Sequence, residues 1–207
     1  MSSKPLLVLG TTNRGKAQEL IRLLAEVDLE ILTLADFPDP IDVVEDGETF
    51  ADNARLKATQ QAVNLKRWVL AEDSGLMVDA LGGAPGVYSA RYSGPGATDK
   101  SNNRFLLEQL GKTPLKKRTA RYVCHLTLCD PSGAIRAERE SFCPGRILFE
   151  PEGNHGFGYD PLFEVPEYGR SFGVLGPEVK ARLSHRARAA RQLIPALKSL
   201  IDSGRWT

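Results

Sequence analysis

The sequence predicts an α/β protein, and three stretches carry that prediction. An apolar run at residues 5–9 is followed by a polar turn and by apolar residues at helical spacing. Two alternating segments within residues 120–142 flank a turn, which indicates a β-hairpin. Apolar side chains at residues 183–201 recur with a period near 3.6, which indicates an amphipathic helix. The chain of 207 residues suits one domain. We expect a β-rich middle that forms a second lobe and leaves a cleft.

The N-terminal part alternates strands and helices. The apolar patterns predict strands at 5–10 and 30–34 and helices at about 15–27 and 48–66, with a proline-rich loop at 35–47. A short buried strand at 68–71 is expected to end at Glu72 and Asp73. Residues 76–78 are expected to form another short strand, and the glycines of 82–96 indicate a loop.

The C-terminal part contains the hairpin and the longest amphipathic pattern. Thr98 can cap a helix that ends before Gly111. Hairpin strands are expected at 120–128 and 135–142 around a turn at 130–133, with one more strand at 144–149. The last helix is expected to begin near Pro177 and to kink or break just before Pro195, because proline lacks the N–H that a helix interior needs.

The bulk composition excludes several classes of protein. The net charge of +1 provides no overall field for nucleic acid or membrane. Arg182, Arg186, Arg188 and Arg191 are interpreted as a solvated helix face. Three cysteines without a C-x-x-C spacing argue against a disulfide framework and a zinc site, and they suit a reducing cytoplasm. The N-terminal apolar run is too short for a signal peptide, and no stretch is long enough to span a membrane.

The turn after the first strand is a candidate phosphate site. Residues 10–16 fit the G-x-x-x-x-G-K pattern of a P-loop, but that loop needs a hydroxyl after the lysine and Ala17 has none. A βα turn also places free backbone N–H groups and the positive end of a helix dipole together. We therefore expect a different phosphate-binding turn, in which Thr11, Thr12 and Asn13 donate and Lys16 supplies charge. A turn without any ligand is the structural alternative.

Two acidic clusters can supply oxygen ligands for the Mg²⁺ that a bound phosphate needs. One cluster is Glu45, Asp46 and Glu48, before the long helix; the other is Glu72 and Asp73, after a buried strand. The second is the stronger candidate because ligands collect at the carboxyl ends of strands in open α/β sheets. For the cluster before the long helix, the alternative is a solvated acidic loop whose charges suit the helix N-terminus. For Asp73, the alternative is a structural role in a turn or as a helix cap.

Aromatic residues near the C-terminal part can hold a nucleobase. Phe157 and Tyr159 offer faces for stacking, and His185 offers a polar edge. Core positions for the two aromatic residues and a helix cap for the histidine are the alternatives.

The sequence resembles the inosine/xanthosine triphosphate pyrophosphatase family, which removes nonstandard purine nucleotides from the nucleotide pool. Four blocks in order carry the resemblance, and together they extend from residue 6 to about residue 193. The blocks are residues 11–20, residues 48–58, residues 72–92, and residues 156–163 with Lys180 and 184–186.

This resemblance implies an elongated two-lobed α/β fold with a long mixed sheet flanked by helices, a cleft between the lobes, and a homodimer. It implies Mg²⁺-dependent hydrolysis of a nucleoside triphosphate such as ITP, dITP or XTP to the monophosphate and pyrophosphate. Thr11, Thr12, Asn13, Arg14, Gly15 and Lys16 would hold the triphosphate, and Ser74 would contact substrate. Glu45 and Asp73 would bind Mg²⁺, with Asp73 as the base and Lys16 as a catalytic charge. Phe157, Gly158, Tyr159 and Asp160 would form the base pocket, and Lys180, His185 and Arg186 would read the base edge.

Two departures from the family pattern stand out. The acidic residue common near residue 172 in the family is absent, and Glu72 replaces a common aspartate, so we assign Glu72 to support of the site. Two other hypotheses are a P-loop kinase or NTPase, which Ala17 disfavours, and a noncatalytic nucleotide- or nucleic-acid-binding module, which the C-terminal arginines suggest.

Overall fold

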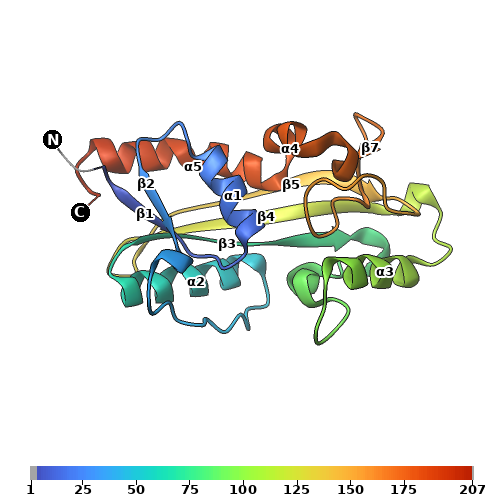
Figure 1. Cartoon of the computed structure of the whole chain (residues 1–207), viewed down its shortest axis with the longest axis horizontal. Helices are drawn as coiled ribbons and strands as arrows, with labels where there is room; N and C mark the ends of the chain where they lie inside the picture. Colours follow the sequence, from blue (N-terminus) through green and yellow to red (C-terminus); the bar gives the residue numbers. More distant parts are fainter. Residues whose placement is uncertain (1–3, 207) are drawn as a thin grey trace. The chain divides into compact units, whose positions relative to one another are not determined.

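The computed structural model describes residues 4–206, and it contains one mixed β-sheet flanked by helices (Figure 1). The strand order is β2-β1-β3-β4-β5-β6-β7, with both parallel and antiparallel pairs. The strands are β1 (Leu6–Leu9), β2 (Glu30–Thr33), β3 (Trp68–Val78), β4 (Thr119–Cys129), β5 (Ile135–Ile147), β6 (Phe163–Val165) and β7 (Arg170–Ser171). The α-helices are α1 (Arg14–Leu23), α2 (Phe50–Leu65), α3 (Asp99–Leu110), α4 (Phe172–Leu183) and α5 (His185–Asp202). The predicted α/β class with a mixed sheet is confirmed.

The chain divides into two compact units. Unit 1 comprises 1–73, 124–141 and 186–207, and unit 2 comprises 74–123 and 142–185. Strands β3, β4 and β5 contribute residues to both units. The expected single domain with a cleft between lobes stays a prediction.

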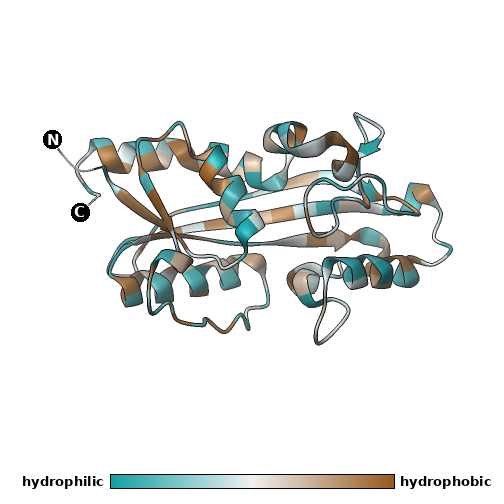
Figure 2. Ribbon diagram, in the orientation of Figure 1, coloured by the Kyte–Doolittle hydropathy of each residue, from teal (hydrophilic) through white to brown (hydrophobic). Residues whose placement is uncertain are grey.

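Unit 1 buries both faces of its strands. Leu7 and Leu9 of β1 belong to a core with α1 and α5, whereas Val8 between them packs with α2. Figure 1 shows α1 and α5 on one side of these strands and α2 on the other. Because alternate side chains point to opposite faces of a strand, an unbroken apolar run fits this two-sided burial. In Figure 2 both β1 and β2 are largely hydrophobic, whereas the helices are striped.

Unit 2 has its own core between α3, α4 and the strands. Leu106 and Leu110 of α3 share a hydrophobic cluster with Tyr122, Phe163 and Phe172. Helix α3 begins at the Thr98 cap, whose Oγ1 accepts a hydrogen bond from the Ser101 N–H at 3.1 Å, and it ends at Gly111. Both predicted bounds of this helix are therefore confirmed.

Strand β3 corrects one expectation. The sequence analysis divided it into short strands at 68–71 and 76–78, with Glu72 and Asp73 after the first, but β3 runs unbroken through both acids. Charged side chains are tolerated inside a buried strand here because Glu72 pairs with Arg186 and Asp73 pairs with Lys57. Asp73 thus lies within a strand and not at a strand end.

The C-terminal part holds the other differences. The expected strand at 144–149 is instead the end of β5, and β6 and β7 were not predicted. Helix α4 begins five residues before Pro177 and is kinked at Gly176, whose φ is 74°. The helical pattern breaks at Ser184, between α4 and α5, while α5 continues through Pro195. The break predicted before Pro195 was therefore wrong. Pro195 and Arg191, four residues before it, are both exposed, so water can bond the carbonyl that the proline leaves without a donor.

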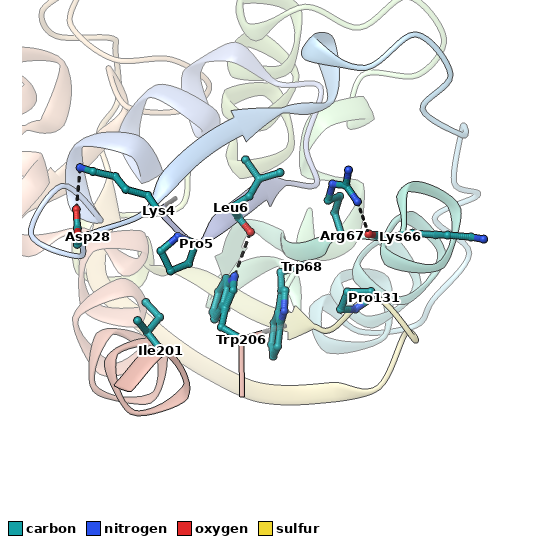
Figure 3. Close-up of a pocket in the computed structure, with 10 residues that line it drawn as sticks. All are labelled: Lys4, Pro5, Leu6, Asp28, Lys66, Arg67, Trp68, Pro131, Ile201 and Trp206. Atoms are coloured by element: carbon teal, nitrogen blue, oxygen red, sulfur yellow. Dashed lines mark hydrogen bonds and ion pairs between the residues drawn. The ribbon is translucent and has the colours of Figure 1, made fainter. Parts of the chain in front are cut away.

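The two ends of the described chain meet in unit 1 (Figure 3). The Trp206 indole stacks on Trp68 with ring centroids 4.3 Å apart and planes at 12°, and its Nε1–H donates to the Leu6 carbonyl at 3.2 Å. Both rings line a pocket of about 740 Å³ with Ile201 and Pro131. Trp206 thus joins the C-terminal tail to the start of β1 by one hydrogen bond.

Trp206→Ala is expected to lower the free energy of unfolding by about 2–3 kcal/mol, because a half-buried aromatic ring and its stacking partner are lost. Trp206→Phe keeps a ring and removes only the N–H donor, so its cost should be about 1 kcal/mol. Urea unfolding followed by circular dichroism measures both variants. Equal losses in the two variants would show that the hydrogen bond, and not the stacking, holds the tail.

Candidate functional site

The predicted phosphate turn connects β1 to α1 in unit 1. Asn13 is the N-cap of α1, and its Oδ1 accepts a hydrogen bond from the Lys16 N–H at 3.1 Å. Thr11 Oγ1 accepts from the Asn13 N–H at 3.2 Å. A Cβ at Gly10 would lie 2.9 Å from Val69 Cγ1, so glycine lets this turn pass close to β3. Thr12, Asn13 and Arg14 are exposed, and the first N–H groups of a helix have no acceptor within it, so the turn presents an anion-binding surface.

Lys16 lies beside the acidic pair of β3. Its Nζ is 3.6 Å from Glu72 Oε1, and its side chain is 18% exposed while that of Glu72 is fully buried. The lysine is therefore held at the edge of the buried charges, with its side chain partly exposed.

Glu72 also forms a deeply buried ion pair in this unit. Arg186 donates to both of its carboxylate oxygens, from Nε at 2.6 Å and from Nη2, and donates from Nη1 to Glu19. Burial lowers the pKa of Arg186, but the charge of Glu72 outweighs this effect and raises that pKa well above its ordinary value. Arg186 thus stays cationic. Paired in this way, Glu72 is better suited to support Lys16 and Arg186 than to bind a metal.

Asp73 and Glu45 converge on one lysine. Lys57 Nζ, from α2, lies 3.0 Å from Asp73 Oδ1 and 2.8 Å from Glu45 Oε2. Asn53 Nδ2 donates to the other oxygen of Asp73 at 3.3 Å. Two carboxylates that are 28 residues apart in the sequence therefore meet at a single ammonium group. Lys16, from the predicted phosphate turn, is close enough for its charge to act on both acids.

The two acids differ in basicity. Burial raises the pKa of Asp73, and the charges of Lys57 and Lys16 offset only part of this shift. Burial acts in the same direction on Glu45, but Lys57 outweighs it and the pKa of Glu45 is lowered. Burial lowers the pKa of Lys57, and the charges of both acids outweigh it and raise that pKa. Burial thus makes Asp73 a stronger base than an ordinary aspartate, whereas Lys57 makes Glu45 a weaker base than an ordinary glutamate.

This pair fits Mg²⁺. The donor atoms are carboxylate oxygens, which a hard cation prefers, and their shared ammonium shows that both oxygens face one positive centre. Within residues 4–206 no group of three or more His, Cys, Asp or Glu residues is arranged to hold a metal. Water and phosphate oxygens would therefore complete the coordination of a cation held by Glu45 and Asp73, as is common for Mg²⁺.

The residues assigned to the base pocket organise a loop of unit 2. Asp160 accepts hydrogen bonds from Lys180 Nζ at 2.5 Å and from the Phe157 N–H at 2.9 Å. Lys180 also lies over the Phe157 ring, 4.3 Å from its centroid. A Cβ at Gly156, whose φ is 80°, would collide with Asp160. Asp160 therefore fixes the loop and orients both the aromatic ring and the lysine.

The other residues assigned to the base have varied surroundings. Asp99 accepts the Gly158 N–H at 2.7 Å. Tyr159 lies in the core of unit 2 and donates to the Ser89 carbonyl at 2.8 Å, and burial raises its pKa. The His185 ring stacks on Tyr122 at 4.7 Å. Tyr159 thus takes the core position that was its alternative, while Ser74 lies within β3 and is half-buried.

Sequence reasoning missed two polar residues of the site, Lys57 and Asn53. Both lie within the block of residues 48–58 that carries the family resemblance, but neither was assigned a role there. The two residues are four positions apart in α2, on the side of the helix that also buries Ala54 and Ala58. A polar residue on an apolar helix face was the signal available, since burial demands a partner.

Comparisons with known proteins were made for the whole chain. The family model described as the Ham1 family matches residues 7–196. A protein named dITP/XTP pyrophosphatase from Rhodopirellula baltica is 54% identical over 197 residues, covering 95% of each chain. Another of that name from Geobacillus kaustophilus is 48% identical over 187 residues, covering 90% of this chain and 91% of the relative. A solved HAM1 protein structure from Coxiella burnetii superposes with a TM-score of 0.85 at 36% identity, covering 94% of this chain and 98% of that one.

Proposed function

This chain belongs to the Ham1 family, and from that premise we propose that it hydrolyses noncanonical purine nucleoside triphosphates (ITP, dITP and XTP) to the nucleoside monophosphate and pyrophosphate. The names of the two curated relatives support the class of reaction. The observation that carries the proposal is the meeting of Asp73 and Glu45 beside Lys16, because a triphosphate hydrolase needs a base, an oxygen-ligand set and a phosphate charge together.

In unit 1 the turn of residues 11–16 binds the phosphates. Thr11, Thr12 and Asn13 offer short polar side chains, and the first turn of α1 offers backbone N–H groups. Lys16 neutralises the charge that accumulates on the leaving pyrophosphate. Arg14 is exposed at the same turn and adds a second positive charge.

Glu45 and Asp73 would hold Mg²⁺. When bound, the ion polarises the phosphate oxygens and neutralises their charge. Lys57 balances the two carboxylates in the protein described here. The chemistry of these residues therefore matches the cation expected from the family resemblance.

Asp73 acts as the general base. Its carboxylate accepts a proton from the water that attacks the α-phosphorus, while the bond between that phosphorus and the bridging oxygen to the β-phosphate breaks. Pyrophosphate leaves with the electron pair of that bond. The raised pKa of Asp73 suits this role, since a stronger base takes the proton more readily.

The unit 2 residues recognise the purine. Phe157 presents a ring whose position is fixed by Asp160 and Lys180. Cationic or N–H donors such as Lys180 favour the 6-keto acceptor of hypoxanthine and xanthine over the 6-amino group of adenine. The assignments of Ser74, His185 and Arg186 to substrate rest on the family resemblance.

A substrate panel tests the proposal. The protein is incubated with dITP, XTP, ITP and ATP, with and without Mg²⁺, and the products are separated by ion-exchange chromatography. We expect the monophosphate and pyrophosphate in equal amounts from the first three, and little from ATP. Orthophosphate without pyrophosphate would refute the proposal. ADP formation from ATP, without turnover of dITP, would favour the P-loop alternative.

A cytoplasmic location and a homodimer also belong to this proposal. Cys124, Cys129 and Cys143 are buried free thiols, which suits a reducing compartment. No helix within residues 4–206 is both long and apolar enough to cross a bilayer. The homodimer rests on the family resemblance, and light scattering coupled to size exclusion measures it.

A further inference from the structure

Polar side chains on one face of helix α2 contact an irregular loop that precedes the helix. The loop comprises residues 37–49, between a 3-10 turn that ends at Asp36 and the first residue of α2. Four polar side chains of α2 at positions i, i+4, i+8 and i+11 contact it. Their contacts are Asn53 to the Gly47 N–H, Lys57 to Glu45, Gln61 to the Ile41 carbonyl and Asn64 to the Asp39 carbonyl.

Asn53 differs from the others because it also reaches a carboxylate of the site. Its Oδ1 accepts the Gly47 N–H at 2.8 Å, and its Nδ2 donates to Asp73 Oδ2 at 3.3 Å. A planar amide carries an acceptor and a donor in one rigid group, so both bonds can form together. Asn53 is 1% exposed, and it therefore connects the loop to β3 inside the protein.

The loop approaches Asn53 too closely for a side chain at Gly47. A Cβ there would lie 2.7 Å from Asn53 Oδ1 and 2.7 Å from Asp52 Cβ. Gly47 is two residues after Glu45, so the hydrogen bond to Asn53 fixes the backbone next to that carboxylate. The Asn53 amide thus connects the backbone next to Glu45 with the Asp73 carboxylate.

We infer that Asn53 is a positioning residue that holds Glu45 and Asp73 at the separation needed to bind a divalent cation together. This inference rests on the proposed function. Lys57 also joins the two carboxylates, but its positive charge opposes a cation in the same place. Asn53 is neutral, so it orients the acids without that opposition.

Mn²⁺ binding without nucleotide tests the inference, followed by electron paramagnetic resonance. Asn53→Ala should weaken Mn²⁺ binding about tenfold or more, the usual cost of losing a hydrogen-bond partner of a metal ligand. Gln61→Ala is the matched control, because Gln61 is 2% exposed, lies on the same helix face and contacts the same loop away from the acids. It should lower the melting temperature but keep Mn²⁺ affinity within about twofold.

Gly47→Ala gives an independent disturbance of the same contact. If Asn53 acts through the loop, a variant that carries both Asn53→Ala and Gly47→Ala should bind Mn²⁺ about as weakly as either single variant. The reason is that the two changes remove one coupled interaction. Additive losses would overturn the link through Gly47.

The outcomes separate this inference from the proposed function. If the wild type turns over dITP and Asn53→Ala keeps the Mn²⁺ affinity of the wild type, the inference is overturned while the proposed function stands. Equal losses of affinity in Asn53→Ala and Gln61→Ala, or an absence of saturable Mn²⁺ binding in the wild type, would also overturn the inference. Weaker Mn²⁺ binding in Asn53→Ala, with no turnover of any triphosphate by the wild type, would support the positioning role and refute the proposed function.

Discussion

Asp73→Asn is expected to lower turnover of dITP by at least about a hundredfold, the scale for losing a positioned general base. The substitution preserves shape and removes the negative charge, so the side chain can no longer take a proton from water. Steady-state kinetics with pyrophosphate detection, over a range of dITP and Mg²⁺ concentrations, measure the effect.

The matched control for this variant is Asp28→Asn. Asp28 is an exposed carboxylate of the same unit, 2.7 Å from Lys4, and its loss should leave turnover unchanged. Thermal unfolding of both variants shows whether Asp73→Asn is folded. Wild-type turnover in a folded Asp73→Asn protein would remove Asp73 from the role of base.

Lys16→Ala is expected to lower kcat/KM for dITP by about a hundredfold or more, since it removes the cation that neutralises the leaving pyrophosphate. It also leaves buried Glu72 with Arg186 as its main positive partner. Because the bidentate Arg186 pair remains, the fold should tolerate the change. Kinetics across dITP concentrations separate the effect on kcat from that on KM.

Lys198→Ala controls for the loss of a lysine from unit 1. Its Nζ pairs with Glu26 at 2.9 Å on the surface, and both side chains are largely exposed, so little change is expected. A Lys16→Ala protein with raised KM but wild-type kcat would show that Lys16 contributes uniform binding and not transition-state stabilisation.

Local elements of this fold were predictable because their causes are local. Helix α3 follows from the Thr98 cap and Gly111, and the 130–133 turn follows from its Asp, Pro and Gly residues. Strand β3 was not predictable in the same way. Glu72 and Asp73 signal a strand end in the sequence, and only their partners Arg186 and Lys57 permit them inside a strand.

The last helix, which the sequence predicts from about Pro177, shows the same division. Its apolar period predicts helix, but one helix with a break before Pro195 was expected, and the structure has α4 and α5 divided at Ser184. Helix propensity and spacing do not reveal where a chain passes from one compact unit to another. The division falls at the unit boundary, between His185 and Arg186, within one residue of Ser184.

By itself the sequence determined the α/β class and the turn between the first strand and the first helix, because strands, caps and turns depend on neighbouring residues. Only the tertiary structure decided which charges meet. It brings Glu45 to Asp73 through Lys57 and Asn53, and it buries Glu72 against Arg186, 114 residues away. Desolvation makes partners obligatory for the buried carboxylates Asp73 and Glu72, and no local pattern states which partner a buried charge will find.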